Sequence, residues 1–245
     1  MSLWNKHAIF EKNSIILSVG ILIVVAIGGL VEIGPLFYLK NTIETVGGVR
    51  PYTPLELEGR DIYVREGCYL CHSQMIRALR DEVERYGHYS LAAESKYDHP
   101  FQWGSKRTGP DIARIGGKYS DDWHRAHLNN PRAVVPGSVM PRYGFLADSP
   151  LDYRHVREKM KVLRIEGVPY SDEDIAQADA DIKAQSSPDD TAAVDALDKR
   201  YPKAVAHAAL GGAATPTEQD ALVAYLQMLG TTVDFKLYDE KANWR

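Results

Sequence analysis

Two cysteines and a histidine lie within one short stretch, Cys68-Tyr69-Leu70-Cys71-His72. Two thiols separated by two residues and followed at once by an imidazole match the attachment signature of haem c. In that arrangement each sulfur adds across one vinyl group of the haem, and the histidine lies against the haem face, where it can bind iron. The sequence therefore predicts a covalent haem c held by Cys68 and Cys71, with His72 as an axial ligand.

Two other sites use the same cysteine spacing. A CxxC pair can be half of a zinc site, but this chain has no third cysteine, so zinc would need two further histidines or carboxylates. It can also be a redox dithiol of the thioredoxin kind, which needs βαβ units around it, and the sequence indicates none. Haem c is the favoured interpretation, and the other two stay open.

An apolar block over residues 15–39 reads IILSVGILIVVAIGGLVEIGPLFYL. As a helix rising about 1.5 Å per residue it is long enough to span a bilayer. A cleaved signal peptide would have a shorter apolar core and a small-residue cleavage site after it, and neither is present. The sequence predicts a polar segment over 1–13, a transmembrane anchor over 14–39 that contacts membrane lipid, and a linker over 40–54. Gly28-Gly29 would let a partner helix approach the anchor closely.

The charges flanking the anchor do not fix its orientation. Lys6 and Lys12 precede it and Lys40 and Arg50 follow it, so the positive-inside count is nearly a tie. Bacterial haem c is attached outside the cytoplasmic membrane, so the motif decides. We expect a single-pass protein of the bacterial inner membrane, with a cytoplasmic N-terminus and the haem domain in the periplasm. A formal net charge of -4 gives no basic footprint for nucleic acid.

Two helices predict the fold of the larger part. Residues 55–66 read as a helix that enters the cysteine motif, with Leu55, Ile62 and Tyr63 on one side and Gly59 available for close packing. Thr217 can cap a last helix that ends at Gly230. This pair resembles the crossing first and last helices of class I cytochromes c. The resemblance implies an all-α, class I cytochrome c-like domain over 55–232, followed by a tail over 233–245.

Two loops extend this resemblance. Gly109-Pro110-Asp111-Ile112 is similar to a segment of class I cytochromes c in which the proline carbonyl accepts a hydrogen bond from the haem histidine, which implies a contact from Pro110 to His72. Residues 136–141 read PGSVMP, a proline-stiffened loop that could carry a soft thioether ligand, and we expect Met140 to be the second axial ligand. The competing methionines are Met75, too close to His72 in sequence, Met160 in a charged run, and Met228 in the last helix.

Between these loops, Ser120 can cap a short helix that ends before Pro131. His124 and His127 share a face of it and could form a metal site, although surface histidines are the favoured interpretation. Residues 73–85 could form a charged helix. The aromatic stretch that follows, to residue 103, is either a self-packed loop or a docking surface, because aromatic residues are enriched in interface cores.

Over residues 10–146, 167–175 and 217–230 the chain resembles the monohaem subunit of cbb3-type cytochrome c oxidase (the CcoO or FixO subunit). The stretch RYGHYSLAAESKYDHPFQWGSKRTGPDIARIGGKYSDDWHRAHLNNPRAVVPGSVMPRY carries the likeness. It implies a subunit of a proton-pumping haem–copper oxidase that relays electrons from a dihaem cytochrome c subunit to the catalytic haem–copper subunit. It also implies that the segment around Trp103 and Ser105 abuts the catalytic subunit near a bound calcium ion.

Residues 176–216 depart from that family pattern. This acidic, alanine-rich insertion predicts two short helices, from 172 to 184 and from 191 to 199, and we expect a solvated excursion from the cytochrome fold, to which the sequence assigns no role. The rival function is a free-standing, membrane-anchored cytochrome c carrier. A third class, a redox or gas sensor, would need a signalling module that the sequence does not indicate. Oxygen reduction by this chain itself is not expected, because His72 and Met140 would leave no open position on the iron.

Overall fold

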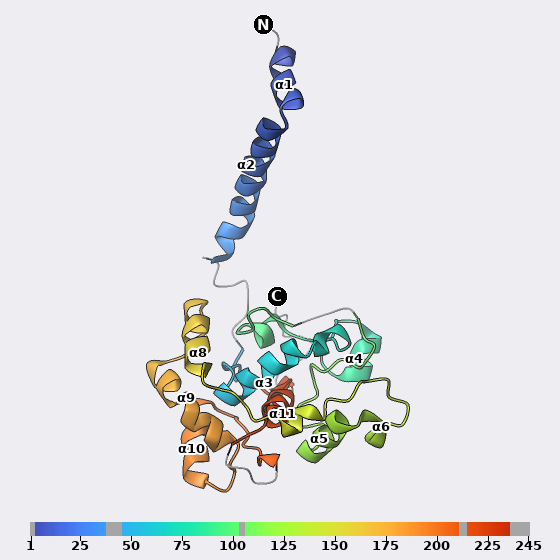
Figure 1. The fold of residues 1–245 in the computed structure, drawn as a ribbon, viewed down its shortest axis with the longest axis vertical. Coiled ribbons are helices and arrows are strands. Elements are labelled where there is room, and N and C mark those ends of the chain that lie inside the picture. The colour runs from blue at the N-terminus through green and yellow to red at the C-terminus, as the bar shows by residue number, and fades with distance from the viewer. Residues whose placement is uncertain (1–2, 38–45, 103–105, 211–214, 236–245) are drawn as a thin grey trace. The chain divides into compact units, whose positions relative to one another are not determined.

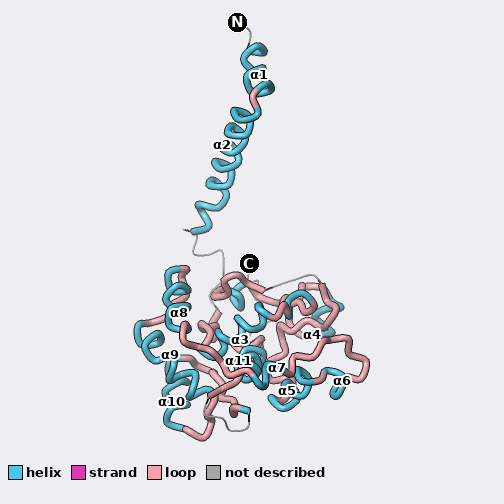
Figure 2. Tube along the Cα trace, viewed as in Figure 1, coloured by secondary structure: helices cyan, strands magenta, loops and turns pink. Residues whose placement is uncertain are grey.

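The computed structural model describes residues 3–37, 46–102, 106–210 and 215–235, and it separates the chain into two compact units, residues 1–44 and 45–245. Figures 1 and 2 show helices joined by loops throughout the described residues. The pairing of Pro150 with Thr217 is an isolated bridge outside any strand. The prediction of an all-α chain is confirmed.

The first unit contains α1 (Leu3–Lys12), α2 (Ser14–Ile33) and η1 (Gly34–Phe37). Asn13 separates the two α-helices and caps the second, because its side-chain oxygen accepts from the backbone N–H groups of Ile15 and Ile16 at 3.1 and 3.2 Å. The stretch Ser14–Leu36 has a mean hydropathy of 2.8 and none of it is buried in the structure. Its length and composition suit a membrane anchor.

The second unit is built around two crossing helices, α3 (Pro54–Arg65) and α11 (Glu218–Met228). Gly59 makes the crossing possible, because a Cβ at this position would lie 1.9 Å from the carbonyl oxygen of Ala221. The ring of Tyr225 on α11 packs against Tyr63 and Tyr52, with centroids 5.5 and 5.8 Å away. Both predicted helices and their close packing are confirmed.

The helix caps follow the sequence closely. Thr53 and Glu56 form a capping box at the start of α3, and Thr217 and Asp220 form another at the start of α11. Ser120 caps α5, as predicted. Among its described residues, the second unit also contains η2 (Cys68–Leu70), α4 (Arg80–Tyr86), η3 (Ala92–Ser95), α5 (Asp121–Asn129), α6 (Pro131–Val134), α7 (Phe145–Asp148), α8 (Val156–Ile165), α9 (Asp172–Gln185) and α10 (Thr191–Arg200).

The charged helix expected over 73–85 is shorter than predicted. Only α4 (Arg80–Tyr86) is helical in this stretch, and residues 73–79 before it have no regular secondary structure. The reason is tertiary pairing of the backbone: Ile112 N–H donates to the carbonyl of Ser73 at 2.9 Å, and Ser90 N–H donates to that of Ile76 at 2.9 Å. Contacts with distant segments have replaced the local helical hydrogen bonds of this stretch.

The acidic insertion is not the solvated excursion that we expected. Its two helices are confirmed as α9 and α10, but their apolar faces are part of the main core, and Ile182, Leu197 and Tyr201 are at most 2% exposed. Gln185, fully buried at the end of α9, accepts a hydrogen bond from the hydroxyl of Thr53 at 2.5 Å. The insertion therefore completes the core beside α3.

A second set of contacts joins the insertion to the chain that enters α3. Arg50 forms a two-pronged ion pair with Glu56, both bonds at 2.7 Å, and also donates to the carbonyl of Pro202 at 3.0 Å. The hydroxyl of Tyr170 donates to the carbonyl of Tyr52 at 2.9 Å. The start of α3 is thus held from both the chain before it and the insertion.

Candidate haem-binding site

The cysteine motif forms one tight turn at the end of α3. Gly67, in the left-handed conformation at φ 69°, ends the helix and lets the chain turn into η2. The carbonyl of Cys68 then accepts from the backbone N–H groups of Cys71 at 3.2 Å and His72 at 3.0 Å. Both thiols are free, with Cys68 partly buried and Cys71 exposed. Two sulfurs and an imidazole therefore come from a single turn.

The imidazole of His72 is held by the Gly109–Pro110 segment. Its Nδ1 lies 2.8 Å from the carbonyl oxygen of Pro110. A carbonyl can only accept, so Nδ1 carries the proton and Nε2 keeps a lone pair that can bind a metal. Gly109 lies against the ring, and a Cβ there would be 2.3 Å from Cε1 of His72. Only glycine leaves room for the ring in this position.

This donor set fits a haem group. The turn offers two free sulfurs and one oriented imidazole nitrogen, which are the groups that the haem c signature requires. Within the described ranges, no three His, Cys, Asp or Glu side chains are grouped so that they could hold a metal ion. The zinc site considered as an alternative would need such a group, and the described residues do not provide one.

The Met140 loop is shaped by Ser138. Its hydroxyl accepts from the N–H of Met140 at 3.2 Å, and its carbonyl accepts from the Arg132 guanidinium at 3.1 Å. Met140 is partly buried and packs against the core, whereas the preceding Val139 is 74% exposed. Burial raises the pKa of the Tyr143 hydroxyl above its ordinary value.

The competing methionines occupy other environments. Met160, which the sequence places in a charged run, is a fully buried core residue of α8. Met228 is partly buried and packs against the core. Met75 is held through its backbone, because its N–H donates to the carboxylate of Asp111, the residue after Pro110, at 3.0 Å.

The two histidines of α5 are not both surface residues. His124 is only 3% exposed, and burial lowers its pKa to about 4, so the surface interpretation is wrong for this residue. His127 lies near the candidate haem ligand: its pKa is lowered by burial first and then by the charge of His72. Its Nδ1 atom is buried and has no hydrogen-bond partner in the described structure.

His127 also belongs to an aromatic stack that the sequence analysis missed. The ring of Trp123 stacks on Tyr119, with centroids 3.9 Å apart, and on His127, with centroids 4.7 Å apart. These three residues are spaced by four along the chain, which is the signal that could have revealed the stack. The stack ends at the imidazole that lies near His72.

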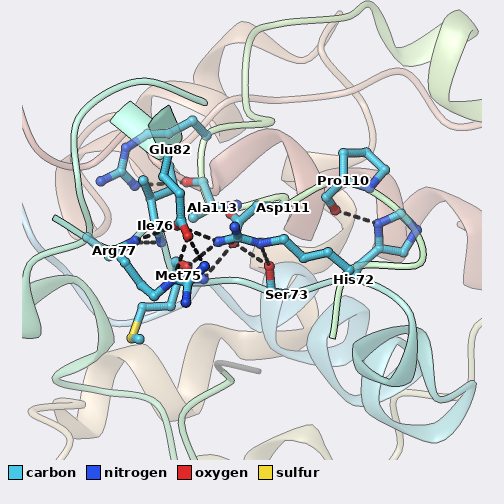
Figure 3. A network of polar contacts seen from close by, with 12 residues as sticks. His72, Ser73, Met75, Ile76, Arg77, Glu82, Pro110, Asp111 and Ala113 are labelled. Carbon is cyan, nitrogen blue, oxygen red and sulfur yellow. Dashed lines mark hydrogen bonds and ion pairs between the residues drawn. The ribbon is translucent and has the colours of Figure 1, made fainter. Parts of the chain in front are cut away.

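A buried polar network beside His72 was also missed. Figure 3 shows its members Ser73, Asp111 and Glu82 close together. Arg107 joins these three residues through hydrogen bonds to each of them. The hydrogen bond of Arg107 to Glu82 holds the pKa of that carboxyl at about 2. Trp103 and Ser105, the candidates for partner and calcium contacts, lie outside the described residues.

An all-α core whose central helix runs into a cysteine-histidine turn, with the imidazole cradled by a Gly-Pro segment, defines a cytochrome c-like domain. An apolar helix near the N-terminus suits a membrane anchor for it. Residues 7–233 match the family described as cytochrome c oxidase, mono-heme subunit/FixO. The chain belongs to this family, as its resemblance indicated, and is therefore a haem-binding subunit of a cytochrome c oxidase complex. No match was found among the curated proteins.

Proposed function

We propose that this chain is the electron-relay subunit of a cbb3-type oxidase. It would take electrons from a dihaem cytochrome c subunit and pass them to the catalytic haem–copper subunit. The observation that carries the proposal is the cradle of His72, whose Nδ1 is bonded to Pro110 at 2.8 Å while Nε2 stays available. Family membership supports a place in an oxidase.

Four residues are assigned to the cofactor in this proposal. Cys68 and Cys71 would hold the haem through thioether bonds, and His72 and Met140 would be the ligands of its iron. The haem, when bound, supplies a one-electron couple whose potential depends on its axial ligands. Pro110 keeps the His72 ring in one orientation and one tautomer. Two protein ligands leave no position for oxygen, so oxygen is reduced in another subunit.

The proposal includes a location and further contacts. The apolar stretch Ser14–Leu36 anchors the chain once in the bacterial inner membrane, in contact with lipid. The haem domain lies in the periplasm, where haem c is attached. Trp103 and Ser105 contact the catalytic subunit near a calcium ion. A periplasm-only reporter should be active when fused after Arg245 and inactive when fused before Leu3, and the reverse result would contradict this orientation.

Purification of the tagged full-length chain in mild detergent tests the function. We expect it to co-purify in fixed stoichiometry with a multi-span haem–copper subunit, and its haem to stay on the chain in a denaturing gel. The Cys68→Ser/Cys71→Ser double variant is the control and should lose the gel-bound haem. A chain that purifies alone with full redox activity would instead favour the free-standing, membrane-anchored carrier.

A further inference from the structure

Two chain segments enclose the hydrogen bond of His72, residues 71–75 and residues 109–113. On one side of this bond, Gly109 N–H donates to the carbonyl of Cys71 at 2.9 Å, and on the other side Ile112 N–H donates to that of Ser73 at 2.9 Å. The bond from His72 to Pro110 lies between these two backbone contacts. Its length therefore depends on how firmly the two segments are held together.

The carboxylate of Asp111 holds both segments. Its Oδ2 atom accepts from the hydroxyl of Ser73 at 2.6 Å and from the N–H of Met75 at 3.0 Å. Its Oδ1 atom accepts from the N–H of Ala113 at 2.8 Å. Asp111 directly follows Pro110, and Ser73 directly follows His72 (Figure 3). The carboxylate of Asp111 therefore ties the residue after Pro110 to Ser73, the residue after His72.

Arg107, which belongs to neither segment, holds the Asp111 carboxylate in position. Its Nε donates to the Ser73 hydroxyl at 2.7 Å, and its Nη2 lies 3.3 Å from Asp111 Oδ2 and 2.7 Å from Glu82 Oε2. The Ser73 hydroxyl gives its single proton to Asp111 and accepts from Arg107, so its position is determined from both sides. The guanidinium also lies 5.1 Å above the ring of Tyr86.

The network is buried, so breaking one of its contacts costs more free energy than breaking a contact at the surface. Ser73, Glu82 and Asp111 are at most 6% exposed. Buried carboxylates are costly unless paired and hydrogen-bonded, and Arg107 pairs with both of them. Glu82 is held further by the N–H of Arg77 at 2.9 Å. Loss of Arg107 would leave the Asp111 carboxylate buried without a counter-charge. Loss of the Asp111 charge would weaken the hydrogen bonds that its two oxygens accept from both segments, so the segments would separate or shift.

We propose that Asp111 is a positioning residue for His72, and that Arg107 and Ser73 hold it in place. A short Nδ1–H bond to Pro110 raises the basicity of the ring and strengthens Nε2 as a donor to iron. Stronger donation favours the ferric state and lowers the reduction potential. Asp111 therefore tunes the potential without touching the haem. This inference rests on the proposed function, because it takes His72 to be an axial ligand.

The test compares variants of the full-length, haem-loaded chain in mild detergent. Asp111→Asn keeps the shape of the side chain but removes the charge that faces Arg107. We expect an upward shift of the reduction potential and a changed low-spin ferric EPR signal, with the haem still covalently attached. Ser73→Ala removes only the hydroxyl between Arg107 and Asp111 and should shift the potential in the same direction by less.

Asp181→Asn is the matched control. Asp181 is also a fully buried carboxylate paired with an arginine, Arg200, but it lies on α9 in the insertion. The Asp181→Asn substitution should lower the stability of the fold and leave the reduction potential and the EPR signal unchanged. The proposal is overturned if Asp111→Asn leaves both unchanged, or if Asp181→Asn shifts them as much. If Asp111→Asn does not fold, an unchanged potential in Ser73→Ala overturns it.

Failure of the proposed function gives a different result. A wild-type chain that holds no haem on a denaturing gel, or a His72→Ala chain that keeps the low-spin spectrum, would refute the role of His72 itself. An unchanged potential in Asp111→Asn, with haem attached and His72 required, would refute only the positioning role.

Discussion

Gly59 of α3 meets the carbonyl oxygen of Ala221 of α11 so closely that a Cβ on the glycine would lie 1.9 Å from it. Backbone atoms cannot move aside as a flexible side chain can. Gly59→Ala should therefore force the two helices apart and lower the free energy of unfolding by about 3 kcal/mol. Chemical denaturation measures the change. Gly47→Ala is the control, because nothing lies within 4 Å of a Cβ there.

Gln185→Ala tests whether the insertion stabilises the start of α3. The substitution leaves the buried Thr53 hydroxyl without its acceptor and the Val205 carbonyl without its side-chain donor. We expect the free energy of unfolding to fall by about 2 to 4 kcal/mol, from unpaired polar groups and a cavity. Asp189→Ala, at an exposed position of the same insertion, should change it little. Equal effects of the two substitutions would contradict the structural role of Gln185.

Acid should weaken a second contact of the insertion. His207 lies 2.8 Å from Asp121, and this hydrogen bond holds the pKa of Asp121 at about 2, below its ordinary 3.8. Since the pKa is lower in the folded state, the contribution of Asp121 to stability is complete above about pH 4 and is lost as the pH falls towards 2. The stability difference between wild type and Asp121→Asn should shrink over this window.

Urea unfolding at several pH values measures that difference. Asp122→Asn, at a neighbouring side chain that is 95% exposed, is the matched control and should show a much smaller pH dependence. A difference between wild type and Asp121→Asn that stays constant as the pH falls would show that the pair does not titrate as described.

Met140→Ala should remove the sixth ligand of the haem iron. We expect loss of the low-spin ferric spectrum, whereas Met140→His should keep low spin and lower the potential, because imidazole stabilises ferrous iron less than a thioether does. Absorption spectroscopy and redox titration measure both effects. Met75→Leu, which changes the methionine nearest His72 in sequence, should change neither. An unchanged spectrum in Met140→Ala would assign the sixth ligand to another residue.

Trp103→Ala should weaken the assembly of this chain with the catalytic subunit. The haem spectrum should stay unchanged, because the proposed iron ligands, His72 and Met140, lie elsewhere in the sequence. A permanent subunit buries a larger and more apolar interface than a transient carrier. The measurement is the yield of the catalytic subunit that co-purifies with the tagged chain. Phe101→Ala, two residues away and at a 45% exposed position, shows whether the effect is particular to Trp103. Unchanged yield and membrane oxidase activity would count against this interface.

Local signals in the sequence predicted the helices well. The predicted caps at Ser120 and Thr217 each accept from a backbone N–H three residues later, so the pattern is visible without the fold. The cap at Thr53 has the same spacing but was missed, because the prediction placed this residue in the linker. The predicted ends of α9 and α10 were each wrong by one residue at most. The haem turn was equally local, because all its donors lie between Cys68 and His72.

The errors came from contacts between distant segments. Residues 73–76 carry a helical pattern but pair with residues 90 and 112, which no local pattern indicates. The insertion appeared solvated because its acidic residues are interspersed mainly with alanines, which carry little apolar surface. Its few large apolar side chains at helical spacing are nevertheless buried in the main core. The network of Asp111 joins residues 25 to 38 positions apart, and sequence spacing alone could not reveal it.

One continuous helix, α3, joins two features of the second unit. The Arg50–Glu56 ion pair, here called the clamp, lies at its start, and the cysteine turn lies at its end. Its 12 residues separate the two by about 18 Å, and each residue also turns the chain by about 100°. The length of α3 therefore fixes the direction in which the cysteine turn points from the clamp, as well as its distance. One added residue in α3 would rotate the thiols by roughly a quarter of a turn or more, while about seven would restore their heading at a distance about 10 Å greater.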